Sequence, residues 1–206
     1  MARIFSVVTK AGLSRIMDPL ARALLRAGVT PDVVTVVGTL GVVVAAVTLA
    51  TRGRLVAATL LITVCALLDV LDGAMARLSG RSSRFGALLD STGDRVADAA
   101  VFGALAYWLA VTGRHWTGVA ALLALVLGML VSYVKARAEG LGLTANVGIA
   151  ERFERLVIIG LGGLAYGFGV PYALEAALWL LVALSAVTVA QRMVHVHRQD
   201  RGVGHD

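Results

Sequence analysis

Residues 69–94 read DVLDGAMARLSGRSSRFGALLDSTGD, and four regularly spaced aspartates in this stretch decide how the chain is interpreted. Asp69 and Asp72 end one very apolar segment, and Asp90 and Asp94 begin the next. On helices, spacings of three and four residues place each pair on one face, one turn apart. Carboxylates beside a bilayer are costly, so two converging pairs predict a cation that neutralises them. We therefore expect a metal site formed by these two helices.

The chain as a whole has the composition of a membrane protein. Hydrophobic residues make up 58% of its 206 residues and charged residues only 16%. A water-soluble domain of this size does not need so high a proportion of hydrophobic residues. The sequence pI is about 10.2. In so apolar a chain, this basic balance favours anionic lipid and phosphorylated substrates over nucleic acid as partners. The single Cys65 excludes an internal disulfide, and we expect it only to pack.

Apolar stretches predict six transmembrane helices, since a span needs roughly 20 mostly apolar residues. They cover residues 33–50, 55–76, 87–111, 116–134, 156–170 and 172–190, give or take a turn. In residues 1–29, apolar side chains are interleaved with cationic ones, as in an amphipathic helix that lies in a membrane interface. We therefore expect an all-α integral membrane protein with a juxtamembrane segment, 1–29, and a six-helix catalytic membrane domain, 30–206.

The loop charges predict the orientation of these helices. The loops on one side hold only Arg52, Arg54 and Arg114, which leaves sixteen of the 19 Lys and Arg residues for the other side. Cytoplasmic loops carry the excess of positive charge in membrane proteins. We therefore expect both termini and the aspartates at the cytoplasmic face of the inner membrane.

The aspartate segment resembles the signature of the CDP-alcohol phosphatidyltransferase family, D-x-x-D-G-x-x-A-R followed by G-x-x-x-D-x-x-x-D, at every fixed position. The resemblance implies a membrane enzyme that uses two divalent cations, Mg²⁺ or Mn²⁺, at the pyrophosphate of a CDP-linked lipid. It also implies a homodimer. The metal ligands would be Asp69, Asp72, Asp90 and Asp94, and Asp94 would also be the general base.

The same resemblance implies where CDP-diacylglycerol binds. Gly73 leaves room beside Asp72, and Arg77 follows one turn later, where it can meet an anion. Residues 30–35, TPDVVT, resemble the nucleotide-facing start of the first span, although many relatives have Asn at the position of Asp32. An acid that only opens the helix is the alternative for Asp32. The residues expected to bind CDP-diacylglycerol are Asp32, Val33, Val34, Thr35, Gly73, Arg77 and Ser83.

A cationic group from three spans suggests a phosphorylated acceptor, because phosphate favours bidentate arginine contacts. The runs SYVKARAE at 132–139 and IAERFERL at 149–156 resemble the bacterial phosphatidylinositol phosphate synthases, whose acceptor is inositol 1-phosphate. Glycerol 3-phosphate is the alternative acceptor, and the general charge bias of inner loops is the alternative origin of these cations. The residues expected to bind the acceptor are Ser132, Lys135, Arg152, Arg155 and Arg192.

The aspartates allow two other interpretations. They could form interfacial ion pairs with Arg77, Arg84 and Arg95, but this does not explain why two acid pairs converge. A divalent-cation transporter would place its acids near the bilayer midplane, whereas these lie toward the inner end of their spans. Outside the motif, Asp98 continues the Asp90–Asp94 face, and we expect it to pair with Arg95 or a neighbouring polar group and not to bind metal.

Overall fold

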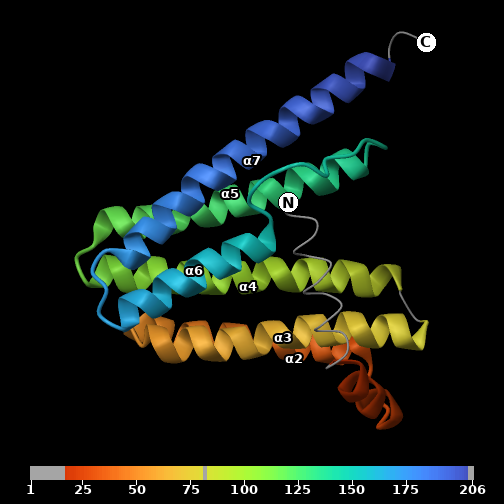
Figure 1. Ribbon diagram of the computed structural model, residues 1–206, viewed down its shortest axis with the longest axis horizontal. Helices are drawn as coiled ribbons and strands as arrows, with labels where there is room; N and C mark the ends of the chain where they lie inside the picture. The colour runs from red at the N-terminus through yellow and green to blue at the C-terminus, as the bar shows by residue number, and fades with distance from the viewer. Residues whose placement is uncertain (1–16, 81–82, 204–206) are drawn as a thin grey trace. The chain divides into compact units, whose positions relative to one another are not determined.

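The computed structural model describes residues 17–80 and 83–203, and within these ranges the regular secondary structure is entirely helical. Residues 17–26 form a helix that precedes the labelled elements of Figure 1. The labelled elements, together with the short 3₁₀ helix η1, are α2 (Pro31–Thr48), η1 (Ala50–Arg52), α3 (Leu55–Ser79), α4 (Arg84–Val111), α5 (His115–Glu139), α6 (Arg152–Gly167) and α7 (Ala173–Val203).

In the described part of the chain, four helical segments are long and apolar enough to cross a membrane. They are Pro31–Arg52, Leu55–Ser79, His115–Glu139 and Ala173–Arg201, which is the make-up of a membrane protein. The other two predicted spans are helices but do not meet this criterion. α6 has only 16 residues, and the first half of α4 carries Arg84, Asp90, Asp94, Arg95 and Asp98.

Helix ends follow local sequence signals. Pro31 opens α2, where its missing N–H costs nothing. Gly80 follows α3 with a φ of 63°, the left-handed conformation that ends many helices. The hydroxyl of Ser83 accepts a hydrogen bond from the Gly86 N–H at 2.8 Å, and so caps the start of α4.

The chain forms two compact units, and each contains part of α2, α3 and α4. The first unit comprises Met1–Ala45 and Leu60–Asp98, and the second comprises Ala46–Thr59 and Ala99–Asp206. In the first unit, α2 packs closely on α3 because glycines face bulkier residues. A Cβ at Gly38 would lie 3.3 Å from the Cys65 carbonyl oxygen, and one at Gly41 would lie 2.6 Å from the Cys65 sulfur. Cys65 is therefore a packing residue, as its apolar surroundings predicted.

The helix at residues 17–26 belongs to this first unit. Ala21 is fully buried in a core cluster with residues of α2 and α3, and Met17, Leu24 and Leu25 pack against that cluster. Its cationic residues, Arg22 and Arg26, are exposed. Residues 17–26 thus form an amphipathic helix whose apolar face contacts protein. The interfacial position predicted for residues 1–29 stays a prediction, and residues 1–16 lie outside the described residues.

In the second unit, α7 packs against α5 and α6 (Figure 1). A group of polar and aromatic side chains in this unit joins the start of α5 to α6 and α7. Glu175 on α7 accepts hydrogen bonds from Arg114 and Thr117, both at 3.1 Å. The Arg114 guanidinium also lies 5.1 Å from the centre of the Tyr166 ring on α6. These contacts fix the start of α5 against α6 and α7.

Candidate functional site

Three of the four motif aspartates converge in the first unit. Asp69, Asp72 and Asp90 each offer a carboxylate oxygen, and these oxygens lie within 4.8 Å of one another. Asp72 is 7% exposed. Three ionised carboxylates this close repel one another unless a cation lies between them. Hard oxygen donors suit Mg²⁺ and Mn²⁺, so the donor set fits the expected divalent metals.

A hydroxyl of α2 contacts this acidic cluster. The Thr35 Oγ1 donates a hydrogen bond to Asp72 Oδ2. Thr35 is 8% exposed, and it lies one turn after Pro31, the first residue of α2. Hydrogen bonds from neighbouring groups fix the orientation of carboxylates that bind metal. Thr35, expected at the nucleotide, therefore also orients an expected metal ligand.

Asp94 lies one turn beyond Asp90 on α4 and is not a member of the three-carboxylate group. Its Oδ2 is 3.7 Å from Nη2 of Arg95, and the same nitrogen is 3.8 Å from Asp98 Oδ2. The expected pairing of Asp98 with Arg95 is confirmed. The ion-pair interpretation of the acids holds in part as well, because Asp94 does pair with an arginine of its own helix.

Several residues expected at CDP-diacylglycerol lie beside two glycines of the first unit. A Cβ at Gly86, the first glycine of the second half-motif, would lie 3.0 Å from Ser83 Oγ and 3.2 Å from Asp32 Oδ1. Asp32 on α2 and Ser83 before α4 thus meet at Gly86, where only a hydrogen leaves room for both. On α3, a Cβ at Gly73 would lie 3.5 Å from the Arg77 Nη1, so the guanidinium folds back over the glycine.

The two valines of the expected nucleotide segment differ in environment. Val33 is 51% exposed, whereas Val34 is buried in the core cluster with Leu71, Ala74 and Met75. The side chain of Val34 therefore packs within the protein, and this residue can offer a ligand only its backbone.

In the second unit, two of the five expected acceptor residues converge on one carbonyl of α5. The Gly128 oxygen accepts hydrogen bonds from Ser132 Oγ and from Arg155 Nη1, each at 3.3 Å. A Cβ at Gly128 would lie 3.2 Å from the Arg155 Cζ, so the guanidinium lies close against this glycine. Arg155 is 2% exposed, while Lys135 and Arg152 are half-buried on the same helices.

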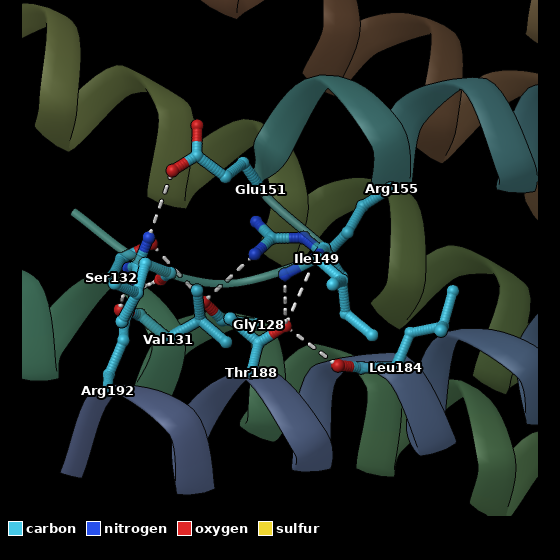
Figure 2. A network of polar contacts seen from close by, with 11 residues as sticks. Gly128, Val131, Ser132, Ile149, Glu151, Arg155, Leu184, Thr188 and Arg192 are labelled. Carbon is cyan, nitrogen blue, oxygen red and sulfur yellow. Dashed lines mark hydrogen bonds and ion pairs between the residues drawn. The ribbon is translucent and has the colours of Figure 1, made fainter. Parts of the chain in front are cut away.

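Arg192 on α7 reaches the same turn of α5. It donates to the Val131 carbonyl at 2.6 Å, to the Val147 carbonyl at 2.8 Å and to Glu151 Oε1 at 3.2 Å (Figure 2). Val131 directly precedes Ser132. The structure thus brings Ser132, Arg155 and Arg192 to one turn of α5, as a shared acceptor site requires.

The connection from α5 to α6, residues 140–151, is held on α7 by residues that the sequence did not single out. Thr188 Oγ1 accepts hydrogen bonds from the N–H groups of Ala150, at 3.1 Å, and Ile149, at 3.3 Å. Gly148 has a φ of 136°, and a Cβ there would collide with the Thr188 methyl group. Gln199 binds the backbone and hydroxyl of Thr144. Spacings of four and seven on α7 place Thr188, Arg192 and Gln199 along one stripe, but hydrogen bonds to a loop leave no pattern that predicts them.

Comparison with known proteins supports the expected family. The sequence model for CDP-alcohol phosphatidyltransferase matches residues 28–191. A Mycobacteroides abscessus protein named phosphatidylinositol phosphate synthase is 48% identical over 198 residues, covering 95% of this chain and 90% of that protein. The Mycobacterium tuberculosis protein of the same name is 45% identical over 190 residues, covering 90% of this chain and 88% of that protein.

Solved structures agree in fold. The crystal structure of Mycobacterium tuberculosis phosphatidylinositol phosphate synthase with CDP-DAG bound aligns with a TM-score of 0.85 and 45% identity, covering 88% of this chain and 94% of that one. The structure of the same enzyme in complex with manganese and citrate aligns with a TM-score of 0.83 and 44% identity, covering 87% of this chain and 88% of that one.

Proposed function

The chain belongs to the CDP-alcohol phosphatidyltransferase family, and from this premise we propose that it transfers the phosphatidyl group of CDP-diacylglycerol to inositol 1-phosphate and releases CMP in phospholipid biosynthesis. The observation that carries this proposal is the convergence of Asp69, Asp72 and Asp90 within 4.8 Å. Relatives named phosphatidylinositol phosphate synthase, 45–48% identical, support the choice of acceptor, as does the solved relative with CDP-DAG bound.

The four aspartates of the motif would hold two divalent cations, Mg²⁺ or Mn²⁺. Asp69, Asp72, Asp90 and Asp94 would supply the carboxylate ligands of these cations. When bound, such cations supply positive charge to the attacking and leaving oxygens of an in-line phosphoryl displacement. The relative solved with manganese supports the use of a divalent metal.

Asp94 is the proposed general base. Its carboxylate would take the proton from the attacking hydroxyl of the acceptor. The oxygen of that hydroxyl then forms a bond to the phosphorus of the phosphatidyl group. The bond from this phosphorus to the oxygen of CMP breaks, and CMP leaves with the electron pair. The proton therefore ends on Asp94, and the acceptor ends on the lipid.

The nucleotide and diphosphate of CDP-diacylglycerol would lie against the residues around Gly86 and Gly73. Asp32 and Ser83 meet at Gly86, and they would offer polar contacts to the nucleotide. Arg77, beside Gly73, would bind the diphosphate as a cation. The full set proposed to bind this substrate is Asp32, Val33, Val34, Thr35, Gly73, Arg77 and Ser83.

The acceptor's phosphate would bind to the cationic group of the second unit. Arg155 and Arg192 are each 2% exposed and are oriented by backbone carbonyls. A guanidinium offers five N–H donors in a planar fork, a geometry that suits the oxygens of a phosphate. The residues proposed to hold the phosphate are Ser132, Lys135, Arg152, Arg155 and Arg192.

The proposed membrane arrangement extends the four apolar helices to six spans by adding α4 and α6. The family's enzymes act on a membrane lipid, and only helices or closed barrels satisfy their backbone inside a bilayer. We place residues 1–29 in the interface, residues 30–206 in the catalytic domain, and both termini on the cytoplasmic side of the inner membrane, because sixteen of 19 cations fall there. We also propose that two copies of the chain form a homodimer.

The test is CMP release by the purified protein in lipid–detergent micelles. CDP-diacylglycerol is supplied with inositol 1-phosphate and Mg²⁺, and each component is omitted in turn. Release that needs all three is the expected result. If CMP release without inositol 1-phosphate equals release in the complete reaction, the protein simply hydrolyses CDP-diacylglycerol. If release after EDTA treatment equals release before it, the proposed role of the metal is wrong.

A further inference from the structure

The guanidinium of Arg192 is fixed in place by backbone groups. Its Nε donates to the Val147 carbonyl at 2.8 Å, and its Nη1 donates to the Val131 carbonyl at 2.6 Å (Figure 2). Thr188 holds the connection that carries Val147 by accepting the N–H groups of Ile149 and Ala150. Hydrogen bonds to carbonyls on two different segments therefore orient this side chain.

The third contact of Arg192 is of a different kind. Its Nη2 is 3.2 Å from Oε1 of Glu151, whose side chain is 56% exposed, while that of Arg192 is 3% exposed. Glu151 is the N-cap residue of α6, yet its carboxylate makes no capping hydrogen bond to its own helix. The acid therefore turns away from its helix terminus to cover Arg192. In this ion pair the arginine is fixed, and the carboxylate can move into water.

We propose that Glu151 is a placeholder for the acceptor's phosphate, because its carboxylate occupies the Arg192 Nη2 that the phosphate would take. This inference rests on the proposed function, which assigns Arg192 to that phosphate. A phosphate dianion carries more charge than a carboxylate and can accept two parallel hydrogen bonds from a guanidinium, so it displaces the carboxylate. A half-exposed ion pair contributes little, so the exchange costs little.

The placeholder also contributes to specificity. An acceptor without a phosphate has no group that can replace the carboxylate on Arg192. The ion pair then persists, and the acid remains where the acceptor would bind. Glu151 therefore disfavours neutral polyols and leaves phosphorylated ones a fixed arginine to bind.

The test is the substitution Glu151→Gln, with Glu154→Gln as a matched control. Both variants remove one carboxylate from an exposed position at the start of α6, but only Glu151 contacts Arg192. Glu151→Gln should lower the KM for inositol 1-phosphate by about two- to fivefold, because an ion pair with one partner in solvent contributes little. The inhibition constant of inorganic phosphate, which competes with the acceptor, should fall by the same factor. The KM for CDP-diacylglycerol should stay the same.

The sign of the change separates a placeholder from a structural role. If Glu151 served only to orient Arg192, Glu151→Gln would raise both the KM for the acceptor and the inhibition constant of phosphate. An unchanged or raised value, or an equal fall in Glu154→Gln, would overturn the placeholder while the proposed function stands. If the wild type releases no CMP with inositol 1-phosphate, the proposed function fails, and the placeholder fails with it.

Discussion

The hydroxyl of Thr35 on α2 donates a hydrogen bond to the carboxylate of Asp72 on α3. This contact links the first apolar helix to the acidic cluster, and both residues are buried. A hydrogen bond therefore joins the proposed nucleotide segment to one of the proposed metal ligands. A change in Thr35 should affect metal binding even though its position in the sequence indicates a nucleotide contact.

The first prediction concerns Thr35→Val, which keeps the shape of the side chain and removes the hydroxyl. Loss of a group that orients a metal ligand typically costs ten- to a hundredfold in affinity. The Mn²⁺ concentration for half-maximal CMP release should rise by about this factor, and Mn²⁺ binding measured by electron paramagnetic resonance should weaken in parallel. Thr35→Ser keeps the hydroxyl and should bind Mn²⁺ nearly as the wild type does. An unchanged metal titration with a raised KM for CDP-diacylglycerol would restrict Thr35 to the nucleotide.

The second prediction concerns the four motif aspartates. Asp69→Asn, Asp72→Asn, Asp90→Asn and Asp94→Asn each remove one negative charge from the proposed metal site. Metal ions supply several kcal/mol of charge stabilisation, so each variant should lose at least about a hundredfold in CMP release. Asp98→Asn, one turn beyond Asp94 and paired with Arg95, is the control and should keep most of its activity. Near wild-type activity in any of the four would contradict that residue's assignment.

The third prediction compares two glycines of α4. Gly86→Ala places a methyl group 3.0 Å from Ser83 Oγ and 3.2 Å from Asp32 Oδ1, whereas a Cβ at Gly103 meets nothing within 4 Å. Gly86→Ala should displace Asp32 and Ser83 and raise the KM for CDP-diacylglycerol about tenfold, the loss of roughly one hydrogen bond to a charged group. Gly103→Ala should leave the KM unchanged. Equal KM values for both variants would contradict the proposed contacts of Asp32 and Ser83 with the nucleotide.

The positions of the helices could be predicted from the apolar runs, but several of their ends could not. The run at 172–190 predicted the last helix, which continues to Val203, and the run at 116–134 predicted a helix that continues to Glu139. An apolar run ends at the first charged residues, but the helix that contains it can continue as long as its backbone N–H and C=O groups remain hydrogen-bonded. Similarly, α4 begins at Arg84, three residues before the predicted start, because Ser83 caps a polar first turn.

For the candidate site, fixed spacing made the aspartates predictable. Helical periodicity places Asp69 and Asp72 on one face of α3, and the pairing of Asp98 with Arg95 follows from their spacing of three on α4. That Asp90 and not Asp94 joins the first two depends on how α3 and α4 pack. The contacts of Glu151 and Thr188 could not be predicted in this way. They depend on how the connection between α5 and α6 lies on α7, and this is set by tertiary packing over about 40 residues of sequence separation.

The fourth prediction concerns the orientation in the membrane. Single cysteines replace Gly113 or Gly142 in a Cys65→Ser background. The two glycines are a matched pair, with φ values of 78° and 77° and nothing within 4 Å of an added Cβ. The proposed six-span arrangement would place sixteen of the 19 cations on the side of Gly142. The cysteine at position 113 should therefore react with an impermeant thiol reagent on intact cells, and the one at 142 should react only after lysis. The reverse pattern would place the aspartates on the outer face.

The most direct test of the account is a competition between acceptors in one reaction. The purified wild type receives CDP-diacylglycerol and Mg²⁺ with equal concentrations of inositol 1-phosphate, free inositol and glycerol 3-phosphate, and mass spectrometry identifies the lipid product. The account predicts that phosphatidylinositol phosphate predominates, because free inositol has no phosphate to offer the buried guanidinium groups of Arg155 and Arg192. Phosphatidylglycerophosphate or phosphatidylinositol as the main product would contradict the proposed acceptor.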